Sequence, residues 1–124
     1  MPWTIGAEGL TVTDWRRRAV VEGAKLERYL LSREHPHGRQ KAQFFERFGF
    51  TQDNAPVLHA ALLDHAAGAT LLEAMNTPFG QKFVLEGSLK SPDGRNPLVR
   101  SIWFEEREGG AVKLVTAYPA GARR

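Results

Sequence analysis

Residues 81–118, QKFVLEGSLKSPDGRNPLVRSIWFEEREGGAVKLVTAY, decide the fold of this 124-residue chain. Apolar and polar residues alternate there with a period of two, which is the pattern of half-buried strands. Two clusters of turn-forming residues, SPDG at 91–94 and EREGG at 106–110, interrupt the alternation. The stretch therefore predicts three strands that pair as an antiparallel meander.

The parity of the strands predicts which side chains share a face. We expect Phe104 opposite Val112, and with it Arg100 opposite Thr116 and beside Tyr118 on one face. An arginine within an apolar stripe costs free energy unless it is paired or opens to a cleft. The position of Arg100 therefore requires either an ion-pair partner or a function. The apolar part of this face, which would accept the helices, comprises Phe83, Leu85, Leu89, Leu98, Ile102, Phe104, Val112 and Leu114.

The same reasoning sets Leu85 beside Ile102 and Gly87 beside Arg100. The remaining side chains would then point to the helix-free face, which is a second candidate for a binding surface. That face is expected to show Glu86, Ser88, Ser101, Trp103, Glu105 and Lys113.

Upstream of the strands the apolar spacing is helical. Apolar residues recur three and four apart in 22–33, in 39–48 and again in a segment that begins at Asp53 or Asn54 and ends near residue 67. Pro56 suits the first turn of the third helix. Residues 70–75 are expected to add a short turn of helix.

These elements predict an α+β fold, with about three N-terminal helices packed on a C-terminal antiparallel sheet of three to four strands. Residues 1–19 are expected to form an N-terminal arm, 20–119 a single domain, and 120–124 a C-terminal tail. A chain of this length can bury one core.

Composition restricts the function classes. The net charge of +3 and the pI near 9.6 favour acidic partners such as nucleic acids. No apolar run is long enough to span a bilayer, no leader segment is recognisable, and the chain contains no cysteine. We therefore expect a cytoplasmic protein that does not interact with membranes and has no cofactor or metal.

The stretch REHPHGRQKAQFF, residues 33–45, carries the first candidate functional residues: His35, His37 and Lys41. Imidazole and ammonium groups can move protons or neutralise phosphate, whereas Arg100, Thr116 and Tyr118 can hold a phosphoryl group. Together they form a set suited to cleaving RNA without a metal.

Each of these residues also has a structural interpretation. His35 precedes a proline and can cap the first helix, and Lys41 is typical of a solvated helix surface. Arg100 can form an ion pair with Glu86 or Glu34. Thr116 and Tyr118 can complete the core and the sheet edge.

Linked motifs indicate a family. KLERYLL at 25–31, HPHGRQKAQFF at 35–45, PDGR at 92–95, VRSIW at 99–103 and KLVTAYP at 113–119 resemble an uncharacterised bacterial domain of unknown function that is often encoded beside a small partner protein. The order of helices and meander is also similar to the barnase, EndoU, colicin and RelE-like ribonuclease fold group, which includes many toxins.

The second resemblance implies metal-independent RNA cleavage by a toxin that a cognate antitoxin protein controls. His35 or His37 would then be general base or acid, Lys41 and Arg100 phosphate ligands, and Thr116 and Tyr118 hydroxyl donors. No complete catalytic set of a characterised ribonuclease can be matched. Because some members of that group use the helix-free sheet face, the rival candidates are Glu86, Ser101 and Trp103.

A second class of function remains open. The chain can be a non-catalytic protein–protein interaction module of a two-gene bacterial pair, with its helices or the face around Trp103 as the contact surface. An accessory domain without any activity of its own is a third possibility.

Overall fold

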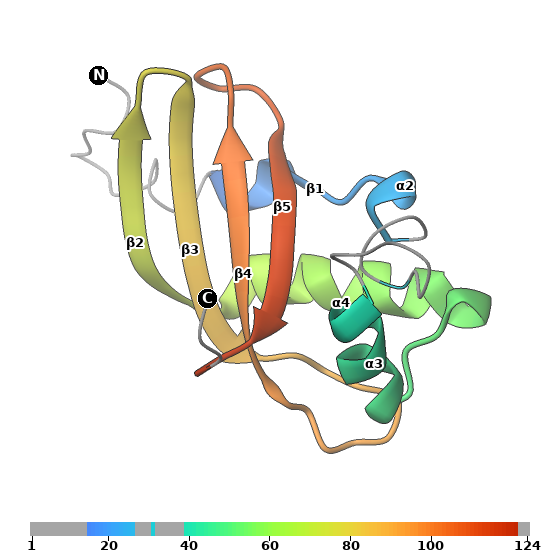
Figure 1. The fold of residues 1–124 in the computed structure, drawn as a ribbon. Coiled ribbons are helices and arrows are strands. Elements are labelled where there is room, and N and C mark those ends of the chain that lie inside the picture. The colour runs from blue at the N-terminus through green and yellow to red at the C-terminus, as the bar shows by residue number, and fades with distance from the viewer. Residues whose placement is uncertain (1–14, 27–30, 32–38, 122–124) are drawn as a thin grey trace.

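The structure is a computed structural model that describes residues 15–26, 31 and 39–121. Short helical segments come first along the chain and most of the strands come last (Figure 1). The elements are η2 (Trp15–Arg18), β1 (Ala19–Val20), α2 (Gly23–Lys25), α3 (Arg39–Arg47), η4 (Gln52–Asn54), α4 (Ala55–Gly68), β2 (Thr70–Thr77), β3 (Gly80–Ser88), β4 (Leu98–Glu105) and β5 (Val112–Pro119). The fold is α+β, with the sheet as its larger part.

The sheet has five strands in the order β1-β5-β4-β3-β2. Strands β2 to β5 form an antiparallel meander, which includes the three strands predicted from the alternation, and β1 lies parallel to β5. The predicted antiparallel sheet of three to four strands is therefore wrong, because the sheet is mixed and has five.

The two unpredicted strands escaped detection for different reasons. β1 has only two residues, too few to show a period. β2, with the sequence TLLEAMNT, is rich in residues that favour helix in isolation, and pairing with β3 overrides that preference. The turn of helix expected at 70–75 is therefore part of an edge strand.

Among the described residues, only α3 and α4 are helices longer than one turn, where about three were predicted. They confirm the second and third predicted helices. Of the helix predicted at 22–33, the described part forms the single turn α2, whereas 27–30 and 32–38 lie outside the described residues. Of the expected arm at 1–19, residues 1–14 also lie outside them, and residues 15–19 form η2 and the first residue of β1.

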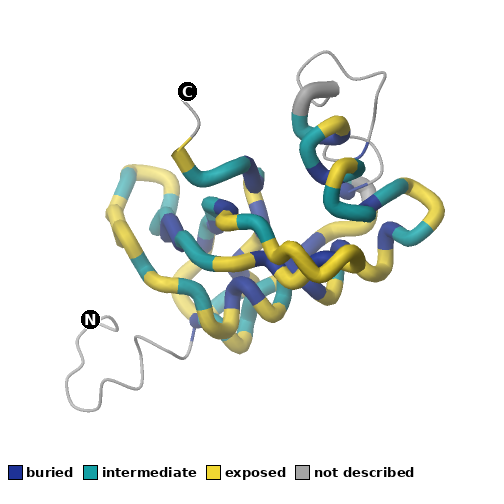
Figure 2. The backbone as a smooth tube through the Cα atoms, turned by 90° about the horizontal axis from the view of Figure 1, so that it is seen from below, coloured by how far each residue is buried: buried dark blue, intermediate teal, exposed yellow. Residues whose placement is uncertain are grey.

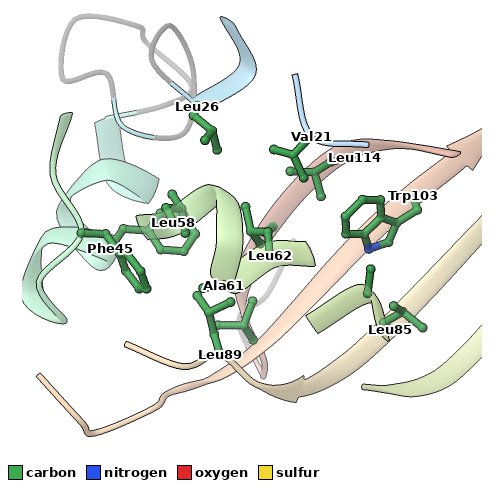
Figure 3. Packing of buried hydrophobic residues seen from close by; sticks show 14 of the residues in the cluster. Val21, Leu26, Phe45, Leu58, Ala61, Leu62, Leu85, Leu89, Trp103 and Leu114 are labelled. Atoms are coloured by element: carbon green, nitrogen blue, oxygen red, sulfur yellow. The ribbon is translucent and has the colours of Figure 1, made fainter. Parts of the chain in front are cut away.

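Helix α4 crosses one face of the sheet and contributes most of the helical part of the core (Figures 1 and 3). Leu58, Leu62 and Ala66 are fully buried, at the spacing that brings residues onto one side of a helix. Phe45 of α3 joins the same cluster. We call the sheet face under α4 the covered face.

The start of α4 agrees with the sequence signals in part. Asn54 is at the N-cap position and Pro56 is in the first turn, as predicted. The Asn54 side chain, however, accepts a hydrogen bond from the Thr51 N–H (2.7 Å) and donates one to the Gly49 carbonyl (3.0 Å). Asn54 thus stabilises the turn before α4 rather than the helix itself.

The segment before β1 closes the core at the other end of α4. The ring of Trp15 is buried and stacks on Phe83, with centroids 4.1 Å apart and planes 9° from parallel. Arg16 donates hydrogen bonds from Nη1 to the carbonyls of Ala66 (3.1 Å) and Ala69 (2.9 Å). The guanidinium thereby satisfies carbonyls at the C-terminal end of α4, where a cation is also favoured by the helix dipole.

The register of β3 with β4 differs by one residue from the prediction. Leu85 pairs with Ser101 rather than Ile102, and Glu86 rather than Gly87 pairs with Arg100. A shift of one residue moves every side chain of a strand to the opposite face. Buried and partly exposed positions accordingly alternate along β4 in the opposite phase, and its covered-face residues are Val99, Ser101, Trp103 and Glu105. Figure 2 shows how buried, intermediate and exposed residues are distributed along the whole backbone.

The register of β4 with β5 differs from the prediction in two steps. On the turn side, Phe104 lies opposite Lys113 instead of Val112, which is a shift of one residue. A bulge then adds a second residue: Trp103 pairs with Leu114 but Ile102 pairs with Thr116, so Val115 is an extra residue and is 41% exposed. Beyond the bulge, Arg100 therefore lies opposite Tyr118 instead of Thr116. Arg100, Thr116 and Tyr118 do share one face, as expected, but it is the face away from α4.

In the described part of the chain, no helix is both long enough and apolar enough to cross a membrane.

Candidate functional site

The sheet face away from α4, which we call the open face, has no described helix over it (Figure 1). The strand pairing arranges its side chains in three rows across β2, β3, β4 and β5. The rows are Thr70, Glu86, Arg100 and Tyr118; then Glu73, Val84, Ile102 and Thr116; and then Met75, Lys82, Phe104 and Lys113.

The first row, which we call the polar row, holds an ion pair between Arg100 and Glu86. Arg100 donates to the Glu86 Oε1 from Nη2 (2.6 Å) and from Nε (3.2 Å). Both side chains are accessible, with 35% of Arg100 and 27% of Glu86 exposed. Tyr118 lies opposite Arg100 on the other neighbouring strand. The row thus places a carboxylate, a guanidinium and a phenol side by side on three consecutive strands.

The electrostatics of the polar row centre on Arg100. Its hydrogen bonds to Glu86 raise the pKa of the guanidinium above its usual value, and the Tyr118 hydroxyl adds a smaller effect in the same direction. Arg100 therefore carries a fixed positive charge. Of the two partners left open by the sequence, Glu86 pairs with Arg100, and Glu34 lies outside the described residues.

Thr116 lies one row away from Arg100, opposite Ile102. Its Oγ1 is buried and has no hydrogen-bond partner among the described residues. A buried hydroxyl without a partner is uncommon and costs free energy. Thr116 is thus a further polar group on the open face near Tyr118.

Ser101 and Trp103 do not belong to the open face. Both are fully buried on the covered face, so their predicted exposure on a helix-free binding surface is wrong. Trp103 donates from Nε1 to the Ser101 Oγ (2.8 Å), and Ser101 lies 2.9 Å from the Nδ1 of His65. The face around Trp103, suggested as a contact surface, is in the core.

His65 completes this buried network from α4. Its Nε2 lies 3.0 Å from the Gly87 carbonyl and 3.1 Å from the Val99 carbonyl. Since carbonyls only accept, Nε2 carries the proton and Nδ1 accepts from the Ser101 hydroxyl. Burial lowers the pKa of His65, so the ring is neutral at pH 7. Every polar group of the network is satisfied, which indicates a structural role.

Of the predicted residues in the 33–45 stretch, the one that the structure describes, Lys41, stands apart from the polar row. Lys41 is half-buried on α3, which lies beside the sheet rather than over its open face (Figure 1). His35 and His37 lie outside the described residues. The structure thus brings together Arg100, Thr116, Tyr118 and Glu86.

The sequence reasoning missed Phe104 as a member of the open face. Lys113 was expected on the helix-free face and lies there, whereas Phe104 was assigned by a parity that the observed register reverses for β4. A phase error of one residue was enough to place Phe104 in the core. The alternation in β4 itself could not have corrected it, because both sets of alternate residues contain apolar and polar members.

A metal site is a separate question. Among the residues that the structure describes, no three His, Cys, Asp or Glu side chains are grouped so that they could hold a metal ion.

Comparison with known proteins identifies a family and a fold. A family model described as a domain of unknown function, DUF6883, matches residues 12–121. No curated protein matches the sequence. Among solved structures, a chain of the contact-dependent growth inhibition toxin–immunity protein complex from Klebsiella pneumoniae 342 superposes with a TM-score of 0.68 and 16% identity, over 88% of this chain and 99% of that chain. At that identity the similarity shows a shared fold.

Proposed function

The chain belongs to the DUF6883 family, a domain of unknown function, and we propose that it is the toxin domain of a bacterial toxin–immunity pair, acting on RNA. The fold shared with a chain of a growth-inhibition toxin–immunity complex supports the toxin–immunity part. The net charge of +3 suits a phosphate polymer as the substrate. A cognate protein would protect the producing cell.

One observation carries the catalytic part of the proposal: Glu86, Arg100 and Tyr118 lie in one row on the open face. A carboxylate can accept a proton, a guanidinium can neutralise the charge that develops on a phosphate, and a phenol can donate a hydrogen bond. The Glu86 Oε1 accepts both hydrogen bonds from Arg100, and Oε2 has no partner among the described residues. Oε2 is thus the oxygen available to act as a base.

The reaction we propose is an internal transesterification. Glu86 takes the proton of a ribose 2′-hydroxyl, the 2′-oxygen forms a bond to the adjacent phosphorus, and the bond from phosphorus to the 5′-oxygen breaks. Arg100 and Tyr118 hold the non-bridging oxygens. The leaving 5′-oxygen needs a proton, and His35 or His37 remains the proposed donor. The products are a 2′,3′-cyclic phosphate and a 5′-hydroxyl.

Lys41 and Thr116 have supporting roles in this proposal. Thr116 adds a hydroxyl one row from Arg100. Because its Oγ1 is buried, the proposed hydrogen bond to a phosphate oxygen requires the side chains over it to move. Lys41 would have to act on a part of the RNA that extends beyond the sheet toward α3. Lys41 would therefore bind a phosphate away from the cleaved bond and would take no part in the reaction itself.

Expression of the chain without a partner tests the proposal directly. Induction in a bacterial host should arrest growth and shorten cellular RNA, with 2′,3′-cyclic phosphate at the new ends. Arg100→Ala and Glu86→Gln should each abolish both effects, because each removes a group that acts only in the reaction. Unchanged circular dichroism would show that these variants fold.

A matched control uses another arginine outside the polar row. Arg95 is 62% exposed in the loop between β3 and β4, and its ion pair with Asp93 resembles that of Arg100 with Glu86 in type. Arg95→Ala should remain toxic. Loss of toxicity in all arginine variants alike would point to net charge instead, and harmless expression of the parent chain would remove the catalytic proposal.

A non-catalytic interaction module is the second candidate. Leu72 and Met75 on the edge strand β2 are about half exposed, and Phe79 at the β2–β3 turn is 79% exposed. Exposed apolar groups beside an unpaired strand edge are typical of surfaces that bind another protein. This candidate predicts harmless expression and co-purification with the product of a neighbouring gene, which Phe79→Ser should weaken.

A further inference from the structure

A pocket of about 460 Å³ lies at the end of the open face away from the polar row. It is lined by Phe104, Glu106, Arg107, Gly110, Ala111 and Lys113, from the ends of β4 and β5 and the turn that joins them. Phe104 and Lys113 lie directly opposite each other in the third row of the face. The pocket is of the size that proteins use for small organic groups.

Phe104 is an aromatic side chain left partly exposed beside this pocket. Its Cζ and Cε2 atoms lie over Gly80, where a Cβ would come within 2.8 Å of the ring. The absence of a side chain at Gly80 therefore lets the ring lie against β3. Held in this way, the ring offers a fixed aromatic surface next to the pocket.

The pocket also contains two cationic side chains. Arg107 is exposed, and Lys113 is 54% exposed and forms an ion pair with Glu22 at 3.4 Å. Ion pairs between exposed side chains contribute little, so a phosphate can compete for the ammonium group. Glu106 is the acidic residue of the lining, and the two cations outnumber it.

An aromatic ring with cations beside it is the arrangement that binds unpaired nucleotides, because the base stacks on the ring and the phosphate meets the positive charge. We propose that this pocket binds one nucleotide of a single-stranded RNA, with the base against Phe104 and the phosphate held by Lys113 and Arg107. The proposal rests on the proposed function, since it places a second subsite on the same face.

The position of the pocket sets its relation to the cleaved phosphate. Phe104 is four residues from Arg100 on the same strand, which corresponds to about 13 Å at the usual rise per residue. The nucleotide in the pocket therefore belongs to the same short stretch of RNA as the reacting nucleotide. The substrate would lie along β4, from the polar row toward the β4–β5 turn.

Binding of synthetic RNA to a Glu86→Gln background, which cannot cleave, tests the pocket. Fluorescence anisotropy would compare a labelled single-stranded RNA hexamer with a hexamer of the same backbone that lacks all bases. Phe104→Leu should weaken binding of the normal hexamer about tenfold, because this corresponds to about 1.4 kcal/mol and lies within the range for one stacked base. It should change binding of the base-free hexamer less than twofold.

The control for the aromatic residue is Phe79→Leu, because Phe79 is the most exposed phenylalanine and does not line the pocket. Its binding should equal that of the parent. Lys113→Gln should weaken both hexamers and reduce the slope of log K against log salt by about 0.7, the contribution of one phosphate contact to a single strand.

Besides a parent chain that binds no hexamer, two results with the Phe104→Leu variant would overturn the proposed nucleotide subsite. One is equal binding of the normal hexamer by Phe104→Leu and the parent. The other is an equal loss on both hexamers, which would mean that the ring supports the fold or a general polyanion surface. Cleavage by the wild-type chain is measured separately, so a pocket that fails while Arg100-dependent cleavage persists leaves the proposed function standing.

Discussion

Both faces of the sheet carry polar side chains near their middle, but these side chains are buried and fully hydrogen-bonded on one face and partly exposed on the other. On the covered face, Trp103, Ser101 and His65 satisfy one another and two backbone carbonyls out of contact with water. On the open face, Glu86 and Arg100 pair while roughly a third of each side chain stays exposed. In the network of the covered face, every hydrogen-bonding group already has a partner. In the pair of the open face, some donors and acceptors are still accessible to a ligand.

This contrast separates structural from functional polar residues within one sheet. A closed network fixes how α4 sits on β3 and β4, because each member has a single set of partners. The half-exposed pair of the open face contributes little to folding by comparison. Substitutions on the covered face should therefore act on stability, and substitutions on the open face on function.

The largest expected effect is on the covered face, at Trp103. Trp103→Ala removes a fully buried indole between β4 and α4, and truncations of this kind cost about 3–5 kcal/mol in the free energy of unfolding. Urea denaturation followed by circular dichroism would measure it. The matched truncation Phe79→Ala, at a site 79% exposed, should stay within about 0.5 kcal/mol of the wild type.

The next effect is at the centre of the network. Ser101→Ala leaves the Trp103 Nε1 proton and the His65 Nδ1 lone pair without a partner, and each unsatisfied group costs about 1–3 kcal/mol. Ser88→Ala, at an exposed position of β3, is the control and should be close to neutral. Equal stability of the two variants in urea would mean that the network does not stabilise the fold.

The same network explains where sequence reasoning failed. In β4, one alternate set is Leu98, Arg100, Ile102 and Phe104, and the other is Val99, Ser101, Trp103 and Glu105. Neither set is clearly the more apolar. The second set is buried, and distant residues bond to two of its polar members: His65 bonds to Ser101, and Arg18 bonds to the Glu105 Oε2 (2.5 Å). Local alternation does not contain that information.

The parts that were predicted correctly depend on local signals alone. The spacing of Leu58, Leu62 and His65 and the position of Pro56 were sufficient for α4. Turn residues and alternation were sufficient for the last three strands. The shared face of Arg100, Thr116 and Tyr118 was predicted correctly only because the bulge at Val115 and the register error together shift the pairing by two residues. The pairing of Glu86 with Arg100 depended on the register itself.

A smaller effect is expected from pH. Burial lowers the pKa of His65 from its usual 6.5, despite the carbonyls of Gly87 and Val99, and the nearby Arg16 guanidinium lowers it further. The unfolded chain therefore binds a proton below about pH 6.5 that the folded chain excludes, and stability falls as the pH falls.

The slope is at most about 1.4 kcal/mol per pH unit for this one group. It can be measured as the difference between the wild type and His65→Gln, with urea titrations at several values of pH between 7.5 and about 5. The carboxylates and the remaining histidines are present in both proteins, so their contributions to the pH dependence cancel in the difference. Parallel curves for the two proteins would mean that His65 titrates alike in the folded and unfolded states.

The smallest effect on stability is expected from exchanging Glu86 and Arg100 between their two strands. The same exchange separates a structural from a catalytic role of the pair most sharply. Arg100→Glu alone sets two carboxylates opposite each other on β3 and β4 and should lower the melting temperature. Adding Glu86→Arg restores an ion pair, and the melting temperature should return close to that of the wild type. Growth arrest should not return, because the base and the phosphate ligand have changed strands, a displacement of about 4.8 Å relative to Tyr118. A doubly exchanged protein that is both stable and toxic would mean that the pair only joins two strands, and that catalysis, if present, lies elsewhere.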